Sequence, residues 1–452
     1  FVGYPAIMPQ NLLGGEMRKA TAETPLSPLW QDIYGFFDEN SQWQKRLSLL
    51  KQGIGKTAKP KRLSPKTAKA LYGKNIFSSV SRLERFAGCP FSFFAEYGLK
   101  AEERRLYQLN TPDLGSLFHE VLELFSNKLE QDNLPWTSLT KEETTARIHA
   151  AVEDAAPRLG NRILLDSAAN QYLIRRLKRI STRAAWTLVQ HLQQGDFVPA
   201  GYEVGFGAHE ALPPIVIRLQ DGGSLILNGK IDRVDLLDAN GTRYVKIIDY
   251  KSGNKTFHFQ DIYYGLQLQL LVYLDAYLKY YKKTGASFKP GGVFYFRITD
   301  PTLALDEELS AEAIEKILYE KMRMSGLLLQ EDVLIHGLDH NLAESRSSAI
   351  VPVGYTKKGD PTAASNLATE EQYAAILDFV ATRTQEIGDA MKAGIITPAP
   401  YRDGQRTPCS YCSYRSLCRH SYAEAPKWRK LKKIDKADFW ESITPKQPPE
   451  TE

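Results

Sequence analysis

The stretch "NGKIDRVDLLDANGTRYVKIIDYKSGN" (228–254) decides the fold, because it holds two strand patterns joined by a turn. Apolar residues fill both halves, and "DANG" (238–241) between them is typical of a tight hairpin. The second strand pattern ends in Asp249 and Lys251, followed at once by Ser-Gly. A surface ion pair at a strand end explains that ending equally well, so the tripeptide alone does not decide the function.

The segments around this hairpin predict an α/β fold. "GYEVGFG" (201–207) and "GGVFYFRI" (291–298) have the composition of further strands. Helical periodicity dominates 111–200, and a long helix is predicted from about Gln260 to Tyr281. A run of strands flanked by helices is the pattern of a layered α/β core.

Composition excludes several classes of protein. The chain has 452 residues, 43% hydrophobic and 25% charged, which is typical of a globular protein with two or three units. The net charge of +5 is too small to argue for nucleic-acid binding by the whole surface. No membrane span or secretory signal is visible, so a cytoplasmic protein is expected. The first residue is Phe1, which suggests a fragment of a longer polypeptide.

Basic residues cluster in three segments, 51–66, 172–186 and 427–433. A block of like charge is usually a solvated linker or an exposed face. Contact with phosphates is the functional alternative, and for 172–186 this means a helix that lines a DNA path. The sequence leaves both interpretations open.

Six polar side chains stand where apolar residues would be expected: His119, Asp232, Asp249, Lys251, Gln269 and Tyr273. Each has an ordinary explanation, such as an ion pair of Asp232 with Arg233 or an i, i+4 contact within a helix. Neighbouring antiparallel strands would bring Asp232 and Asp249 together, however. Two adjacent carboxylates repel each other unless a cation lies between them.

This set has the chemistry that phosphodiester hydrolysis needs. Oxygen ligands with one imidazole suit Mg²⁺ or Mn²⁺. Such a metal polarises a phosphoryl oxygen and lowers the pKa of a water. Lys251 can orient that water and offset the charge that develops on the phosphate.

The cysteines form a second pattern, because Cys409, Cys412 and Cys418 lie close together and Cys89 lies far upstream. A disulfide framework is unusual in a large chain without a secretory signal. Four thiolates on one metal centre fit better. The spacing alone does not separate zinc from an iron–sulfur cluster.

The order of the polar motifs resembles that of RecB-family nucleases of the PD-(D/E)xK superfamily. The motifs are "GSLFHEVLE" (115–123), "GKIDRVD" (229–235), "IIDYKSG" (247–253) and "QLQLLVYL" (267–274).

The resemblance implies that His119, Asp232, Asp249 and the backbone carbonyl of Tyr250 hold a metal. It also implies that Lys251 is catalytic, together with Asp232 and Asp249. Gln269 and Tyr273 match a Q-x-x-x-Y motif of the catalytic set, and Glu203 matches an acidic position on the first core strand.

The cysteine pattern is similar to the iron–sulfur staple of the bacterial AddB family. This implies a [4Fe–4S] cluster on Cys89, Cys409, Cys412 and Cys418 that joins the N- and C-terminal parts of a restriction-endonuclease-like core, a mixed sheet flanked by helices with a helical insertion. The expected organisation is a helicase-like end and basic linker (1–78), a nuclease domain (79–425) and a basic tail (426–452). Within the nuclease domain we expect a helical part (111–200), a catalytic core (201–300) and a cysteine segment (403–420).

The resemblance also implies the function and the partners. We expect a metal-dependent exonuclease that degrades single-stranded DNA, the 5′-ended strand, in a heterodimer with an AddA-type helicase–nuclease during double-strand-break repair. The alternative is a non-catalytic DNA-binding module with a structural zinc or iron–sulfur site.

Overall fold

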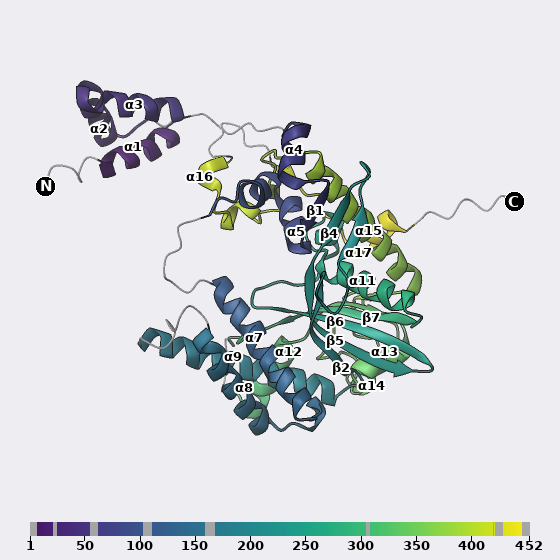
Figure 1. Cartoon of the computed structure of the whole chain (residues 1–452). Coiled ribbons are helices and arrows are strands. Elements are labelled where there is room, and N and C mark those ends of the chain that lie inside the picture. Colours follow the sequence, from purple (N-terminus) through teal and green to yellow (C-terminus); the bar gives the residue numbers. More distant parts are fainter. Residues whose placement is uncertain are drawn as a thin grey trace. The chain divides into compact units, whose positions relative to one another are not determined.

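The computed structural model describes residues 7–20, 25–54, 62–102, 111–158, 168–303, 308–418, 420 and 428–444. These residues form two compact units (Figure 1). Unit 1 comprises Phe1–Leu71, Gly88–Glu103 and Met391–Lys432, and unit 2 comprises Tyr72–Ala87, Arg104–Ala390 and Lys433–Glu452. Parts of two basic segments, residues 55–61 and 427, lie outside the described residues.

Unit 2 is built on a six-stranded sheet with the order β2-β5-β6-β7-β8-β9. Its strands are β2 (Val198–Phe206), β5 (Gly229–Ala239), β6 (Thr242–Lys251), β7 (Phe288–Arg297), β8 (Ser325–Leu329) and β9 (Leu367–Ala368). The pairs β6–β7 and β8–β9 are parallel, and the other pairs are antiparallel. The predicted mixed α/β sheet is therefore confirmed, and it extends beyond the expected core at 201–300.

Helices cover this sheet. The longer ones are α7 (Thr111–Gln131), α8 (Lys141–Ala155), α9 (Ala168–Gln193), α11 (Gln269–Lys283), α12 (Ala311–Lys321) and α15 (Glu370–Lys392). Figure 1 shows α7, α8 and α9 grouped together at one side of the sheet. Helix α7 packs against α8, α9 and β2, whereas α11 packs against β6 and β7. Shorter helices complete the unit: α5 (Val80–Gly88), α10 (Phe259–Tyr263), α13 (Asp332–Leu338), α14 (Leu342–Ser345) and α17 (Lys436–Ile443).

A second sheet interrupts one of the predicted strands. The sequence predicts one strand through 224–237, but the structure divides it at Asn228 into β4 (Ser224–Leu227) and β5. Strand β4 pairs with β1 (Asn75–Ser78) and β3 (Ile215–Arg218) in a three-stranded sheet. The backbone N–H of Asn228 donates to the Ser78 carbonyl at 3.0 Å, which ends the pairing with β1 just where β5 begins.

The helix predicted from about 260 to 281 is also divided. Helix α10 ends before Gly265, whose φ of +73° is the left-handed conformation that glycine adopts most easily. Helix α11 starts at Gln269, and the Glu84 carboxylate on α5 accepts hydrogen bonds from the N–H groups of Leu268 (2.8 Å) and Gln269 (3.1 Å). The break therefore places Gln269 at the start of a helix, where a distant acidic residue caps it.

Unit 1 contains α1 (Ile7–Lys19), α2 (Pro28–Glu39), α3 (Ser41–Gly53) and α4 (Pro65–Tyr72). The first three enclose a small core of Leu13, Phe37 and Leu47. The remaining short elements are α6 (Pro90–Phe93), a π-helical turn (Phe94–Gly98), β10 (Tyr401–Arg402), a 3₁₀ turn (Pro408–Tyr411), α16 (Arg415–Cys418) and β11 (Arg429–Lys430). Cys89, Phe91, Phe94 and Cys418 belong to a separate buried cluster in this unit.

A buried ion cluster connects β5 and β6 in the core of unit 2. The Arg233 guanidinium donates to both oxygens of Asp235, at 2.6 and 3.1 Å, and Lys246 Nζ lies 2.9 Å from Asp235 Oδ2. Burial opposes ionisation of Asp235, but the two cations hold its pKa below the usual range. The guanidinium also lies over the Trp136 ring at 4.7 Å.

We expect Asp235→Ala to lower the free energy of unfolding by about 3–5 kcal/mol, because it leaves two buried cations without a counter-charge. Asp238→Ala is the matched control, since Asp238 makes the same two-bond contact with Arg243 at the surface. Thermal unfolding should separate the two variants clearly. Equal melting temperatures for both would contradict this account of the core.

Candidate active site

Three carboxylates lie in a row across neighbouring strands. The pairing of β2 with β5 places Glu203 opposite Asp232. The pairing of β5 with β6, continued by one residue, places Asp232 opposite Asp249. Glu203 also has a φ of +49°, a left-handed conformation that a residue with a Cβ rarely adopts. The expected proximity of Asp232 and Asp249 is therefore present, and Glu203 extends the row.

Helix α7 brings His119 to this row. His119 Nδ1 lies 3.3 Å from Asp232 Oδ2. One ligand atom from each of His119, Glu203 and Asp232 lies within 4.8 Å of the other two. An imidazole with two carboxylates is a donor set that can hold a divalent cation.

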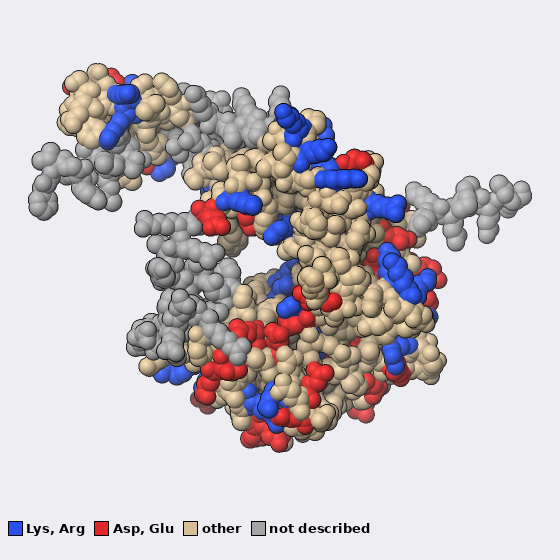
Figure 2. Space-filling view, in the orientation of Figure 1, with Lys and Arg blue, Asp and Glu red and all other residues tan. Residues whose placement is uncertain are grey.

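His119 and Glu203 border a cavity of about 630 Å³. Its lining includes Glu120, Glu123 and Glu203 together with His119, and no Lys or Arg is among the described residues that line it. On the face drawn in Figure 2, acidic side chains gather over the region that Figure 1 labels α7 and α8. The cavity is therefore electrostatically suited to a cation.

Asp249 is held by two side chains. Gln269 Nε2 donates to Asp249 Oδ1 at 2.8 Å, and Lys251 Nζ forms an ion pair with Asp249 Oδ2. Asp249 is only 3% exposed, whereas the Lys251 side chain keeps 24% of its surface accessible. The amide thus fixes the carboxylate, while the lysine side chain remains partly accessible.

The ordinary explanations for these aspartates do not hold. Arg233 bonds Asp235 and not Asp232, so the predicted alternative of an Asp232–Arg233 pair is wrong. Asp232 Oδ2 instead accepts the backbone N–H of Tyr250 at 2.6 Å. The pair of Asp249 with Lys251 does form, but its carboxylate is buried and is not at the surface.

The pKa values reflect the crowding of negative charge. Burial and the neighbouring charge of Asp232 together raise the pKa of Asp249 to about 6, against the opposing effect of Lys251. Burial likewise raises the pKa of Glu203 to about 7, with Asp232 adding to the shift. Burial lowers the pKa of His119, but the hydrogen bond and the charge of Asp232 outweigh it, so the net shift is upward. A bound cation would favour the ionised form of all the carboxylates.

Tyr273 lies one turn after Gln269 on α11, but its hydroxyl and ring contact β5 and β2, whereas Gln269 bonds Asp249. Its hydroxyl packs against Gly229, where a Cβ would lie 2.2 Å from the oxygen. Its ring contacts that of Phe206 on β2, with 5.6 Å between the centroids. Tyr273 therefore fixes the start of β5, the strand that carries Asp232.

The four cysteines meet in unit 1, where they line one cavity of about 20 Å³. Cys89 and Cys418 are buried, and none of these four described cysteines forms a disulfide. Burial raises the pKa of Cys409 to about 11, and the neighbouring thiols contribute to the shift. His420 lines the same cavity, and its backbone N–H donates to Cys418 Sγ at 3.4 Å.

Residues 78–419 match the family model of the PD-(D/E)XK nuclease superfamily, and this range contains every carboxylate of the row. The chain belongs to the PD-(D/E)XK nuclease superfamily. Residues 10–53 separately match the model of the ATP-dependent helicase/deoxyribonuclease AddB fifth domain. The resemblances to the nuclease superfamily and to the AddB family that the sequence suggested are thus confirmed.

Several curated relatives are named as subunits of an ATP-dependent helicase/deoxyribonuclease. The relative from Alkaliphilus oremlandii is 40% identical over 430 residues, which are 94% of this chain and 37% of the relative. That from Alkaliphilus metalliredigens is 41% identical over 404 residues, 89% of this chain and 35% of the relative. For Thermoanaerobacter pseudethanolicus the identity is 35% over 419 residues, with shares of 92% and 36%. The chain therefore spans little more than a third of the length of these relatives.

The structure brings His119, Asp232, Asp249, Lys251 and Gln269 together at the carboxylate row; their role as a site stays a prediction. It adds two residues that the sequence did not assign to a site. Glu84 follows Ser81 by three residues, a spacing that indicates a local capping box, but its oxygens bond Leu268, Gln269 and Lys255. His420 beside the cysteines gave no signal beyond its position two residues after Cys418.

In the part of the chain that the structure describes, no helix combines the length and the apolar character that a membrane span requires.

We expect the protein without bound metal to lose stability as the pH rises, because of Glu203. Burial raises the pKa of Glu203 to about 7, so its folded form binds a proton more tightly than the unfolded chain. The resulting stabilisation is complete below the ordinary glutamate pKa of about 4.3 and is lost as the pH passes through about 7. In EDTA, Glu203→Gln should melt like the wild type near pH 4 and at a higher temperature near pH 8.

Added Mg²⁺ or Mn²⁺ should raise the melting temperature of the wild type at about pH 8, because it restores a counter-charge for the carboxylates. The metal should stabilise Glu203→Gln less. A difference between the two proteins that does not change with pH would contradict the assigned role of Glu203.

Proposed function

We propose that this chain is a metal-dependent deoxyribonuclease that acts as an exonuclease on single-stranded DNA. The observation that carries the proposal is the row of Glu203, Asp232 and Asp249, with His119 beside Asp232 and Lys251 beside Asp249. Two ammonium groups accompany the three carboxylates, Lys251 at Asp249 and Lys230 at 3.3 Å from Glu203 Oε2, so the buried Asp232 has only the imidazole of His119 as an ionisable partner among the described residues. A set of this kind, beside an open acidic cavity, is suited to a divalent metal and a phosphate.

The donor set fits Mg²⁺ or Mn²⁺. His119, Asp232 and Asp249 would hold the ion, and Glu203 lies close enough to His119 and Asp232 to join them. The Tyr250 N–H donates to Asp232, and the N–H and C=O of a strand residue face the same side, which supports the carbonyl of Tyr250 as a further donor. When bound, the ion supplies Lewis-acid polarisation of a phosphoryl oxygen and a water of lowered pKa.

Lys251 contributes a fixed positive charge. Burial lowers its pKa, but Asp249 and Asp232 outweigh this effect and raise it, so the ammonium group stays protonated at neutral pH. Lys251 is therefore suited to stabilise negative charge on the phosphate and to orient a water, not to accept a proton. Gln269 keeps Asp249 in place, and Tyr273 keeps β5 in place, so both are positioning residues.

The names of the relatives support a wider assignment. They are named as one subunit of an ATP-dependent helicase/deoxyribonuclease, and this chain matches little more than a third of their length. We therefore propose that the chain works in the cytoplasm in a complex with an AddA-type helicase–nuclease. In that complex it would degrade the 5′-ended strand that unwinding releases during double-strand-break repair.

The four thiols line one cavity and none forms a disulfide, which supports a shared metal centre on Cys89, Cys409, Cys412 and Cys418. Thiolates bind zinc and iron–sulfur clusters alike. The resemblance of the cysteine pattern to the AddB family supports a [4Fe–4S] cluster. A cluster would link Cys89 to Cys409 across the long stretch of chain between them. Such a link lowers the entropy of the unfolded chain by on the order of 5 kcal/mol, so we expect the cluster to have a structural role.

We expect Asp249→Ala and Lys251→Ala each to slow the Mg²⁺-dependent degradation of an end-labelled single strand by at least about 10²- to 10³-fold. Asp249 would no longer hold the metal, and Lys251 would no longer stabilise the phosphate. The surface variant Asp238→Ala should keep the wild-type rate. Labels at the 5′ and 3′ ends report which end is degraded first.

Wild-type rates in both site variants would refute the nuclease assignment. DNA binding that ignores Mg²⁺ and both substitutions would then support the alternative, a non-catalytic DNA-binding module with a zinc or iron–sulfur site.

For the cysteine site, we expect Cys409→Ser to lose iron and inorganic sulfide and to melt at a lower temperature than the wild type. The reason is that one of four ligands is lost from a group that links distant segments of unit 1. Ser410→Ala, at the exposed neighbouring position, is the control. A colourless wild-type protein with stoichiometric zinc would exclude the cluster, and an equally stable Cys409→Ser protein would exclude the structural role.

A further inference from the structure

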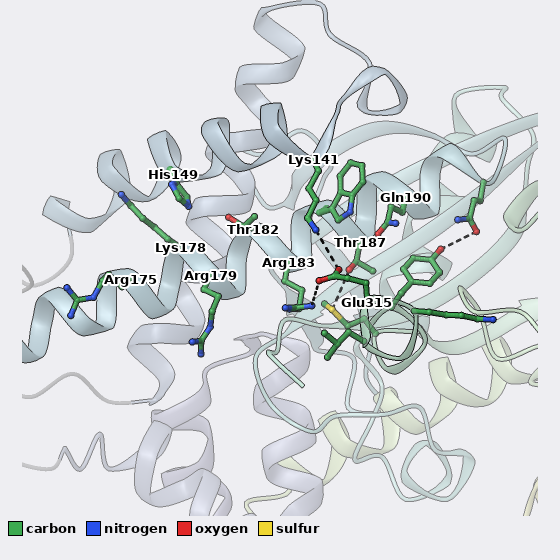
Figure 3. Close-up of a pocket in the computed structure, with 16 residues that line it drawn as sticks. Lys141, His149, Arg175, Lys178, Arg179, Thr182, Arg183, Thr187, Gln190 and Glu315 are labelled. Atoms are coloured by element: carbon green, nitrogen blue, oxygen red, sulfur yellow. Dashed lines mark hydrogen bonds and ion pairs between the residues drawn. The ribbon is translucent and has the colours of Figure 1, made fainter. Parts of the chain in front are cut away.

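A basic groove lies on unit 2 between α8, α9 and α12, and its volume is about 590 Å³ (Figure 3). Its described lining contains six Lys or Arg side chains and one carboxylate, Glu315. The basic residues are Lys141, Arg175, Lys178, Arg179, Arg183 and Lys316. This balance of charge is the reverse of that in the cavity beside the carboxylate row.

The positive charge of the groove is only partly neutralised. Lys178 pairs with Glu153 at 2.6 Å, and Arg179 and Arg183 share Asp300 at 2.8 and 3.2 Å. Lys141 lies 3.7 Å from Glu315. These pairs are at least partly open to water, so each holds its cation weakly.

Two cations remain available. Arg175 and Lys316 are exposed, and among the described residues neither has an ion pair. The groove therefore keeps an excess of positive charge that a polyanion can use.

The sequence of α9 explains why its arginines form a stripe along the groove. Arg175, Arg179 and Arg183 recur every four residues, so they follow one face of the helix. Figure 3 shows Arg179 and Arg183 projecting to the same side of α9, while Lys178 points toward His149. Between the first and last arginine the helix rises about 12 Å, long enough to follow several phosphates of a strand.

The groove also offers an aromatic surface. Trp186 follows Arg183 by one turn on α9 and keeps part of its surface accessible, and Tyr319 of α12 lines the opposite wall. Aromatic rings beside a row of cations are the combination that binds unpaired nucleic-acid strands, because bases stack on the rings while the cations follow the backbone. Free phosphate would use the cations alone.

We propose that this groove is a holding site for a single DNA strand, separate from the carboxylate row. Arg175, Arg179, Arg183 and Lys316 would contact the phosphates, and Trp186 would stack against a base. The inference rests on the proposed function, because it assigns the strand as the nuclease substrate.

The electrostatics favour such a site. The cavity beside the row is lined by acidic side chains, which a bound metal offsets only in part, so a basic surface elsewhere would add binding energy for a polyanion. Helix α7, which carries His119, packs against α8 and α9, so the groove and the site belong to one group of helices.

The test uses the 452-residue chain with Arg175→Glu and Lys316→Glu combined. In EDTA, its affinity for a single strand of about 20 nucleotides should fall at least tenfold, and the slope of log K against log salt should decrease by about 1.4 for two lost phosphate contacts. Lys357→Glu with Lys358→Glu makes the same change of charge at exposed loop positions and should keep both values. Equal melting temperatures confirm that the variants are folded.

Trp186→Leu tests the stacking contact separately. We expect it to weaken strand binding about tenfold without changing the salt slope, since it removes no charge. An unchanged affinity for this variant, with inorganic polyphosphate competing as well as DNA does, would mean a general anion surface and would overturn the strand assignment.

Cleavage distinguishes this inference from the proposed function. With Mg²⁺, the Arg175/Lys316 variant should cleave a strand of about 5 nucleotides at the wild-type rate and one of about 20 nucleotides more slowly. If the wild type cleaves both strands while binding and salt slope are the same in the variant, the groove proposal is wrong and the nuclease assignment stands. If the wild type cleaves neither strand, the nuclease assignment fails, and the strand in the groove is no longer a nuclease substrate.

Discussion

The repulsion among Glu203, Asp232 and Asp249 is the constraint on which the rest of the site depends. Adjacent strands place these carboxylates opposite one another, and two of them have strongly raised pKa values because burial and mutual repulsion disfavour their charged forms. A fold that needed only stability would have avoided this arrangement. The same strands show the contrast, since Asp235 is buried just as deeply but is neutralised by Arg233 and Lys246. The charge of Asp235 is therefore balanced within the protein, whereas the carboxylate row is left for a bound cation to balance.

The surrounding structure holds the repelling groups in place. Gln269 bonds Asp249 from the first turn of α11, and the Tyr250 N–H bonds Asp232 from the neighbouring strand. Helix α11 can start there because helix α10 ends a few residues earlier and because Glu84 on α5 caps the new helix. The position of the Gln269 side chain thus depends on Glu84, almost two hundred positions earlier in the chain. Glu84 lies on the helix that leads directly to Cys89.

Much of this was accessible from the sequence, and the reasons for the rest are physical. Strand periodicity predicted β5 and β6, and their antiparallel pairing was enough to bring Asp232 and Asp249 together. The break between α10 and α11 was missed because the apolar periodicity continues across Gly265, and the split at Asn228 was missed because both halves are good strands. Glu84 could not be assigned, since a local capping box explained it and its real partners come from tertiary packing. The neighbouring sequence does not indicate the left-handed backbone conformation of Glu203 either.

The balance of charge over unit 2 links these features to a path for the substrate. A site that concentrates carboxylates attracts metal but repels DNA, so affinity for the strand has to come from surfaces where cations outnumber acids. Lys251 alone cannot supply it, because Asp249 already pairs with its ammonium group. The stripe of Arg175, Arg179 and Arg183 has the required excess, and its partial ion pairs can exchange a carboxylate for a phosphate at little cost in Coulomb energy.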